Sequence, residues 1–266
     1  MLRNTRNIIF QSLFPDKEYA AAKLSVANAT QSQIFHGKYH DRIIIWKEIL
    51  ELMTNEEYKK LSISEFTKAA SRYEGSQAGI YEMCKKDYPD ILAELETEPF
   101  TDLLDAGCGP APMLSLLSEK YPDRHYTGLD LTPAMVEQAK KKNLPNTTLV
   151  VGDCENFPFE DNSFDAIICS QSFHHYPNPQ AFFNSVKRCL RPGGRLILRD
   201  MTTDNKLVRW FINTIELPLA NRIGHGDVKL ATRETVEKCC KNAGLKVEKF
   251  EIRKGMRLHS VIRKEK

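Results

Sequence analysis

Apolar residues recur at helical spacing through the first hundred positions of the chain. Two such sets are Ile43, Ile44, Trp46, Ile49, Leu50 and Met53, and then Ile80, Met83, Cys84, Ile91, Leu92 and Leu95. Residues three and four positions apart share one face of an α-helix. Pro89 interrupts the second set and is expected to bend or break that helix. The pattern predicts a helical N-terminal region over residues 1–98, which Pro99 closes.

Beyond Pro99, apolar runs of strand type alternate with helical periods. The predicted strands cover residues 102–106, 125–130, 148–151, 164–170, 195–199, 246–252 and 257–262. The predicted helices cover residues 112–121, a segment from Pro133, and residues 179–190, 206–220 and 233–242. Such alternation is typical of βαβ units around a parallel sheet. We therefore predict a doubly wound α/β domain over residues 99–266.

Local signals fix some ends of these elements. Thr132 followed by Pro133 is a typical helix start. Gly244 is placed to end the helix over residues 233–242. The run Pro192-Gly193-Gly194 predicts a turn that leads into the fifth strand.

The composition is that of an ordinary globular protein. Of the 266 residues, 41% are hydrophobic and 27% are charged, and the net charge is +3. That charge is too small to indicate a nucleic-acid partner, which usually leaves a clustered basic stripe. The sequence has no run of 18 apolar residues, so we expect no membrane span, and residues 1–14 lack the pattern of a signal peptide. We expect a cytoplasmic protein.

Cysteine and histidine usage gives no sign of a disulfide framework or a metal site. The seven cysteines form no Cys-x-x-Cys pair, and most lie inside apolar runs, so we expect buried, reduced thiols. His36 and His40 lie four positions apart and could share one helix face, as metal ligands do. No acidic or cysteine ligand accompanies them and Gly37 weakens the helix, so no metal site is predicted.

The most informative segment is LLDAGCGPAP at residues 103–112, which joins a predicted strand to a predicted helix. Gly107 and Gly109 allow a tight turn and a close approach of a ligand to the backbone. Free N–H groups at the start of the following helix face the same place. Asp130 ends the next strand, where a carboxylate can accept hydrogen bonds from ribose hydroxyls. These features predict a nucleotide-type ligand.

Two classes of cofactor share that pattern. The dinucleotide fingerprint needs Gly or Ala at its sixth position, where this chain has Pro112. Asp105 precedes the first glycine, and its charge would repel a pyrophosphate but suit a cation. Because a methionine moiety carries an ammonium group, Asp105 favours an adenosyl amino acid over NAD. For the loop taken alone, a plain strand–helix turn without a ligand is the alternative.

Four segments carry a resemblance to a known family. They are LLDAGCGPA (103–111), YTGLDLTPAMVEQA (126–139), VVGDCENFPFEDNSFDAIICSQSFHHYPNP (150–179) and LRPGGRLILRD (190–200). With them the chain resembles the class I S-adenosylmethionine-dependent methyltransferases, within the ubiquinone/menaquinone-biosynthesis-like group (methyltransferase type 11 domain). The resemblance is close over residues 102–200 and looser over residues 232–262. It implies a Rossmann-like sheet of seven strands with the last antiparallel, and S-adenosyl-L-methionine as the cofactor.

The resemblance also implies which residues bind that cofactor, all of them near the carboxyl ends of the strands. It assigns Asp105, Gly107 and Gly109 to the methionine end, Asp130 to the ribose, Leu131 or Met135 to the adenine surroundings, Asp153 and Cys154 to the adenine edge, and Ser170 and Gln171 to the sulfonium side. The chain departs from the family at Ala111, where a third glycine is frequent. We expect a somewhat tighter loop there.

His174, His175 and Tyr176 follow the fourth strand, where the transferred methyl group is expected. Methyl transfer is an in-line displacement that needs alignment and, for some acceptors, removal of a proton. We predict His174 rather than His175 as the candidate general base, because a histidine titrates near neutral pH. We do not expect both adjacent rings to face the site together. The alternative role for the pair is packing of the loop.

The acceptor site carries weaker signals. Tyr73 and Tyr81 could contact the methionine end from the N-terminal region, or could simply be core or surface residues. Residues 203–230 are expected to cover the acceptor pocket as a lid insert, and their conspicuous side chains are Trp210, Phe211, Arg222 and His225. Those aromatic rings could equally belong to the core. The apolar N-terminal helices would suit a homodimer contact.

We therefore predict transfer of a methyl group from S-adenosylmethionine to a small-molecule acceptor. An RNA or protein acceptor is the first alternative, although the Asn/Asp-Pro-Pro-aromatic tetrad of enzymes that methylate exocyclic base amines does not follow the fourth strand. An NAD-dependent oxidoreductase or a non-catalytic nucleotide-binding module is the second alternative. Pro112 and Asp105 argue against the oxidoreductase.

Overall fold

The computed structural model describes residues 53–75 and 80–266. The chain divides into two units, Met1–Leu52 and Met53–Lys266, and all described residues belong to the second. The predicted helix through residues 43–50 and the His36/His40 pair lie outside the described residues.

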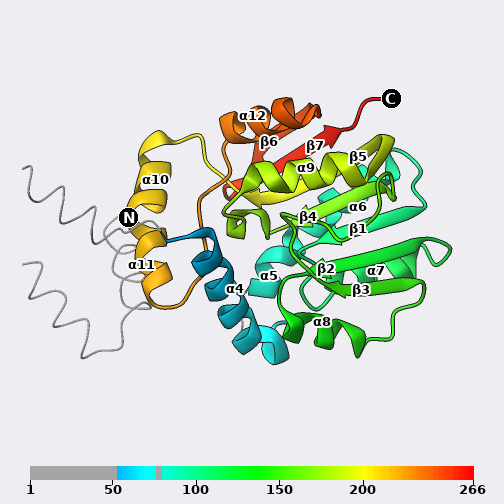
Figure 1. The fold of residues 1–266 in the computed structure, drawn as a ribbon, viewed down its shortest axis with the longest axis horizontal. Helices are drawn as coiled ribbons and strands as arrows, with labels where there is room; N and C mark the ends of the chain where they lie inside the picture. Colours follow the sequence, from blue (N-terminus) through cyan, green and yellow to red (C-terminus); the bar gives the residue numbers. More distant parts are fainter. Residues whose placement is uncertain (1–52, 76–79) are drawn as a thin grey trace, which may run out of the picture. The chain divides into compact units, whose positions relative to one another are not determined.

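A seven-stranded sheet with the order β3-β2-β1-β4-β5-β7-β6 forms the centre of the second unit (Figure 1). The strands are β1 Asp102–Ala106, β2 His125–Asp130, β3 Thr147–Val151, β4 Phe164–Ser170, β5 Leu190–Met201, β6 Lys246–Arg253 and β7 Arg257–Arg263. The pairs β1/β2, β1/β4, β2/β3 and β4/β5 are parallel, whereas β7 runs antiparallel to both β5 and β6. The predicted doubly wound sheet with an antiparallel last strand is confirmed.

Helices cover both faces of this sheet (Figure 1). The helical elements are α4 Asn55–Ala69, η1 Ala70–Arg72, α5 Ile80–Cys84, η2 Lys85–Asp87, α6 Tyr88–Glu96, α7 Pro112–Lys120, α8 Pro133–Lys140, η3 Phe173–His175, α9 Pro179–Cys189, α10 Lys206–Phe211, the π-helical turn η4 Ile212–Glu216, α11 Leu217–Arg222 and α12 Arg233–Ala243. One core contains apolar side chains of α9 and α12, and the other contains side chains of α6 and α7.

The alternation of side chains along each strand explains the two cores. Leu104 and Ile167 belong to the α9/α12 core, whereas their neighbours Leu103 and Ile168 belong to the α6/α7 core. Successive side chains of a strand point to opposite faces, so a strand buried on both faces is apolar throughout.

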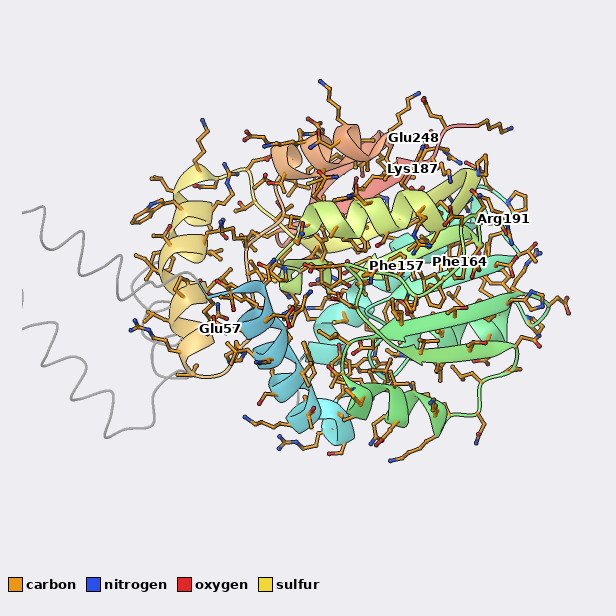
Figure 2. The ribbon with its side chains drawn as sticks, in the orientation of Figure 1. Glu57, Phe157, Phe164, Lys187, Arg191 and Glu248 are labelled. Atoms are coloured by element: carbon orange, nitrogen blue, oxygen red, sulfur yellow. The ribbon has the colours of Figure 1, made fainter. Side chains whose placement is uncertain are left out.

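Aromatic rings fill much of the α9/α12 core. Figure 2 marks Phe157 and Phe164 in the interior beside α9, and both are buried members of this core. The Phe157 ring meets Phe182 of α9 edge to face, at a centroid distance of 6.0 Å. Glu57 on α4 and Glu248 on β6 are exposed (Figure 2). Apolar packing on both faces of the sheet therefore holds in place the strand ends that carry the polar loops.

Several predicted ends are confirmed. The strands β1, β2 and β4 have the predicted limits. Gly244 ends α12 with a left-handed φ of 68°, and Thr132 occupies the N-cap position of α8. Pro89 lies in the first turn of α6, so the apolar run of residues 80–95 is divided among α5, η2 and α6.

One prediction about secondary structure is wrong, and another is confirmed in a modified form. The run Pro192-Gly193-Gly194 does not form a separate turn but belongs to β5, because the Gly193 amide donates to Lys264 O at 2.7 Å and the Lys264 amide donates to Gly194 O at 3.0 Å. The helical stretch predicted over residues 206–220 is present as a continuous run of α10, η4 and α11, which extends to Arg222. Pro218 lacks an N–H group, and a π-helical turn precedes it, a usual way to accommodate a break in the hydrogen-bond ladder.

All seven cysteines are buried and free, which confirms the predicted thiols. Among the helices of residues 53–75 and 80–266, none is long and apolar enough to cross a membrane.

Candidate functional site

Acidic residues gather where the parallel strands end. Asp105 is the penultimate residue of β1, Asp130 is the last residue of β2, and Asp153 follows β3 by two residues. Because β3, β2 and β1 are parallel neighbours in the sheet, these ends lie along one edge. Open α/β sheets bind ligands outside the carboxyl ends of their strands.

The loop after β1 is held against β2. The Gly107 and Cys108 amides donate to Leu129 O at 2.8 and 3.0 Å, and the Gly109 amide donates to Asp130 Oδ2 at 2.8 Å. Ala111 then begins α7 with a φ of 58°, a left-handed conformation that favours glycine. A glycine at this position would adopt this conformation without strain.

Gly107 is required by its surroundings. Its φ is 80°, and a Cβ atom added there would lie 2.0 Å from Ser172 Oγ and 2.5 Å from Ser172 Cβ. Gly109 differs, because a Cβ atom added to it would meet nothing within 4 Å. The first glycine therefore allows the close approach of the loop after β4, whereas the second is required for its backbone angle alone.

Asp105 lies in surroundings that disfavour its negative charge. The residue is 4% exposed, and burial together with the charge of Asp130 raises its pKa to about 8. Burial also raises the pKa of Asp130, while hydrogen bonds from the Thr132 and Gly109 amides lower it in part. A ligand that brings a cation to Asp105 would relieve this cost.

A pocket opens at this edge of the sheet. Five predicted cofactor residues line it: Gly107, Asp130, Leu131, Asp153 and Cys154. The other lining residues are Lys59, Ser62, Phe66, Thr132, Glu155, Ser172, His175, Tyr176 and Pro177. The predicted residues Asp105, Gly109, Met135, Ser170 and Gln171 are not part of this lining.

The positions of the non-lining residues have separate causes. Met135 is buried within the packing of α8, away from the pocket surface. Gln171 adopts a left-handed φ of 51°, and its side-chain amide donates to Asp87 Oδ2 at 2.7 Å. Ser170 Oγ and Gln171 Oε1 are buried and have no hydrogen-bond partner among residues 53–75 and 80–266. Unpaired buried oxygens at a strand end suit a polar ligand.

Lys59 of α4 enters the pocket and could not be identified from the sequence. Its Nζ lies 2.7 Å from Asp153 Oδ2 and 2.7 Å from Glu155 Oε2. Burial lowers the pKa of this lysine, but the two carboxylates outweigh that effect and raise it. The other Asp153 oxygen, Oδ1, accepts from the Glu155 amide at 2.8 Å. The acid predicted to bind the adenine edge thus already holds a cation from α4.

A buried ionic cluster joins the N-terminal helices to the sheet. Asp87 is 0% exposed and accepts from Arg199 Nε at 2.9 Å, Arg257 Nε at 2.9 Å and Gln171 Nε2 at 2.7 Å. Arg199 Nη2 also reaches Asp90 Oδ2 at 2.8 Å. The cluster fixes Gln171, which follows β4, relative to α6 and β5.

His174 and His175 of η3 both point toward Asp227, which follows α11. His174 Nδ1 lies 2.7 Å from Asp200 Oδ1. Asp227 Oδ1 lies 3.4 Å from His174 Nε2 and 3.3 Å from His175 Nδ1. The short 3₁₀ turn brings the two ring centroids to 4.2 Å, but only His175 lines the pocket, in keeping with the expectation that the adjacent rings would not face the site together.

The two histidines have different electrostatic surroundings. Burial lowers the pKa of His174, but Asp200 and Asp227 outweigh it and raise that pKa to about 9. Burial and the charge of His174 lower the pKa of His175 to about 4. His175, and not the predicted His174, lines the pocket.

Other predicted residues lie around this centre. The Tyr176 hydroxyl lies 2.8 Å from Ser172 Oγ, above the glycine loop, and Tyr73 contacts Cys84 at 3.6 Å. Tyr81 packs against the α6/α7 core. Trp210 and Phe211 are exposed on α10, so the alternative that they belong to the core is wrong. Arg222 ends α11 and is exposed, and His225 Nδ1 pairs with Glu65 of α4 at 2.5 Å.

Comparison with known proteins identifies relatives of this chain. A family model described as a methyltransferase domain matches residues 104–198. The chain is 37% identical over 118 residues to phthiotriol/phenolphthiotriol dimycocerosates methyltransferase 1 of Mycobacterium ulcerans, and this match covers 44% of each protein. It is 31% identical over 189 residues to a second protein of that organism, named Probable phthiotriol/phenolphthiotriol dimycocerosates methyltransferase 2. That match covers 67% of this chain and 72% of the relative.

Solved structures agree on the fold. A SAM-dependent methyltransferase from Aquifex aeolicus superposes with a TM-score of 0.57 at 18% identity, over 76% of this chain and 98% of that one. At this identity the likeness concerns the arrangement of helices and strands.

Proposed function

The chain belongs to the class I S-adenosylmethionine-dependent methyltransferases, and on that premise we propose that it methylates a hydroxyl group of a small, apolar acceptor. The family establishes S-adenosyl-L-methionine as the cofactor. What we propose is the chemical class of the acceptor and the role of each residue in the reaction.

The residues at the edge of the sheet fit this cofactor. Asp105, whose surroundings disfavour its charge, would bind the ammonium group of the methionine moiety. Gly107 would let the backbone approach the ligand, and Asp130 would accept from ribose hydroxyls. Asp153 and Cys154 line the pocket where the adenine edge would lie. Ser170 and Gln171, whose buried oxygens are unpaired, would lie on the sulfonium side.

The bound cofactor supplies an electrophilic methyl group on a sulfonium. The tasks left to the chain are alignment of the acceptor, exclusion of water and disposal of the acceptor proton. The His174, His175 and Asp227 side chains lie beside the pocket and can hold that proton or help to remove it. Asp200 fixes the His174 ring through Nδ1, so the other nitrogen of the ring faces Asp227. His174, the predicted catalytic residue, therefore acts within this group.

An apolar acceptor with a hydroxyl group is supported by two observations. The relatives are named for phthiotriol and phenolphthiotriol dimycocerosates, and the ending of these names denotes hydroxyl groups. The helices α10 and α11, with the π-helical turn between them, expose large apolar side chains: Leu207, Val208, Trp210, Phe211, Ile215, Leu219 and Ile223. The segment after α11 delivers Asp227 to the histidines, so we propose that residues 203–230 cover the acceptor.

The observation that carries the proposal is the row of Asp105, Asp130 and Asp153 at the ends of adjacent strands, beside a pocket that also contains His175. The test is transfer of a tritium-labelled methyl group from S-adenosylmethionine to a long-chain diol, an alkylphenol, transfer RNA and a mixed protein sample. We expect label in the diol or the phenol. Label in RNA or protein alone would overturn the proposed acceptor class.

A matched pair of variants makes the test specific to the site. Asp130→Asn is expected to lose most transfer, because the ribose loses its charged acceptor. Asp123→Asn changes an exposed aspartate after α7 and is expected to keep it. Equal activity of the two variants would remove Asp130 from the proposed cofactor site.

A further inference from the structure

We propose that His174, His175 and Asp227 bind a divalent transition-metal ion of the zinc type. One nitrogen of each ring and a carboxylate oxygen of Asp227 lie within 4.8 Å of one another. Two imidazole nitrogens and one carboxylate oxygen are typical ligands of Zn²⁺. The site goes beyond cofactor binding, and its role in the reaction rests on the proposed function.

The spacing of the donor atoms fits a tetrahedral ion better than a direct hydrogen bond. Asp227 Oδ1 lies 3.4 Å from His174 Nε2 and 3.3 Å from His175 Nδ1. A good N–H···O bond is about 2.9 Å long. With Zn–N and Zn–O bonds of about 2.0–2.1 Å, neighbouring ligand atoms of a tetrahedron lie about 3.3–3.4 Å apart. The two measured distances correspond to such edges.

The nitrogen of His175 that faces Asp227 lacks another partner. His175 Nδ1 is buried and makes no hydrogen bond within the described part of the chain. A buried nitrogen of this kind is costly unless something binds it. An ion between the rings and the carboxylate would satisfy it.

The outer nitrogen of His174 is held as it is in known metal sites. His174 Nδ1 lies 2.7 Å from the fully buried Asp200, whose carboxylate also accepts from the His174 amide at 3.0 Å. Metal-binding histidines almost always donate their second N–H group to a carboxylate or carbonyl, which fixes the tautomer and the ring orientation. His174 has such a partner in Asp200.

Asp227 is delivered by a segment that is anchored independently of any ion. The Gly226 amide donates to Glu65 Oε2 at 3.1 Å, and Ser62 Oγ donates to Gly226 O at 3.3 Å. The Val228 amide donates to His174 O at 2.8 Å. These bonds hold the loop against both α4 and η3, so the three ligands are already assembled.

Three protein ligands leave one position of a tetrahedral ion open, which is the usual arrangement of catalytic zinc. His175 lines the pocket and Asp227 belongs to the segment that we propose covers the acceptor, so the open position would lie between the two. A hydroxyl bound there would have a lowered pKa and would release its proton to solvent, leaving the oxygen as the nucleophile. The ion would thus do the work for which a histidine base was predicted.

The test measures metal binding without any turnover. The full chain is freed of metal with a chelator and titrated calorimetrically with Zn²⁺, and Co²⁺ is added separately to record its visible spectrum. We expect one ion per chain and the intense visible bands of tetrahedral Co²⁺. Absence of binding by the wild-type protein would overturn the proposal.

Variants locate the ion. Asp227→Ala alters a loop side chain that is 25% exposed and is expected to weaken Zn²⁺ binding about 100-fold and to remove the Co²⁺ bands. His175→Ala is expected to do the same. The control is His125→Ala, which removes a histidine that also faces an aspartate, Asp102 at 3.2 Å, but lies at the opposite strand ends. Unchanged binding in Asp227→Ala would place the ion elsewhere and refute the site.

The same proteins separate this inference from the proposed function. Binding of S-adenosylhomocysteine should survive Asp227→Ala within about threefold, because Asp227 is not part of the pocket lining. Zn²⁺ binding without adenosyl binding would retain the metal site and remove the methyltransferase account. If metal-free protein binds the adenosyl ligands and methylates hydroxyl groups, and added Zn²⁺ changes neither, the methyltransferase function stands and the metal ion has no part in the reaction.

Discussion

The substitution Asp87→Asn tests whether the buried ionic cluster fixes the N-terminal helices to the sheet. The Asp87 carboxylate is fully buried and accepts from two arginines and from Gln171. An asparagine keeps the shape of the side chain but removes its charge and turns an NH₂ group toward other donors. Arg199, which is 1% exposed, would lose its main counter-ion.

The expected loss follows from the burial of the pair. Removing one partner of a buried ion pair costs about 3–5 kcal/mol, because the other charge remains buried. Asp90 Oδ2 still contacts Arg199 at 2.8 Å, so we expect the lower end of that range, about 3 kcal/mol. For a domain of this size, that loss corresponds to a fall in Tm of about 6–12 °C.

Urea unfolding followed by circular dichroism, together with thermal melts, measures the effect. The matched control is Asp102→Asn, which removes a surface partner of Arg191, 2.8 Å away, with both side chains more than a quarter exposed. An exposed pair of this kind contributes about 0–1 kcal/mol. Equal losses for Asp87→Asn and Asp102→Asn would refute the reasoning that burial of the pair makes the cluster strong.

Further predictions concern the pocket. Gly107→Ala should lower the unfolding free energy by at least about 2 kcal/mol and abolish adenosyl binding, because it combines a left-handed φ with a clash. Gly109→Ala should lower the unfolding free energy by about 1 kcal/mol, and urea unfolding compares the two variants. The pKa of Asp105 is raised to about 8 in the folded chain, so the unfolded chain releases that proton first and the stability of the ligand-free protein should fall as the pH rises from about 4 to about 8. In thermal melts across this pH range, Asp105→Asn should show a smaller loss of stability than the wild-type protein. It should also weaken the binding of S-adenosylmethionine at least about tenfold. An unchanged pH profile of stability would contradict the raised pKa of Asp105. Lys59→Met should free the Asp153 carboxylate and tighten S-adenosylhomocysteine binding about threefold or more in calorimetry. The control Lys60→Met, on the exposed face of α4, should leave that binding unchanged. Weaker binding by Lys59→Met would show that the lysine helps to bind the ligand.

Local patterns were enough to predict most of the sheet. The apolar runs that become β1, β2 and β4 are buried on both faces, so composition and neighbouring turn residues fix their limits. The convergence of the acids at the strand ends was also predictable, because parallel strands bring their carboxyl ends to one edge of the sheet. The limits of β5 were not, since its first residues pair with the end of the chain around Lys264.

The rest of the site depends on contacts between distant segments. Lys59 reaches Asp153 across 94 positions of sequence, and no local pattern marks it among the other lysines of α4. The convergence of His174 and His175 depends on a 3₁₀ turn and on Asp227, which arrives from beyond α11. The sequence favoured His174, and no local pattern showed that His175 is the ring that lines the pocket.

The carboxyl edge of the sheet should bind an adenosyl amino acid. Isothermal titration of the full chain with S-adenosylmethionine, S-adenosylhomocysteine and NAD, repeated with Asp130→Asn and with the control Asp123→Asn, tests it most directly. We predict micromolar binding of both adenosyl ligands, at least about tenfold weaker in Asp130→Asn and unchanged in Asp123→Asn, with no binding of NAD. Tighter binding of NAD, or adenosyl binding that is indifferent to Asp130→Asn, would contradict the account.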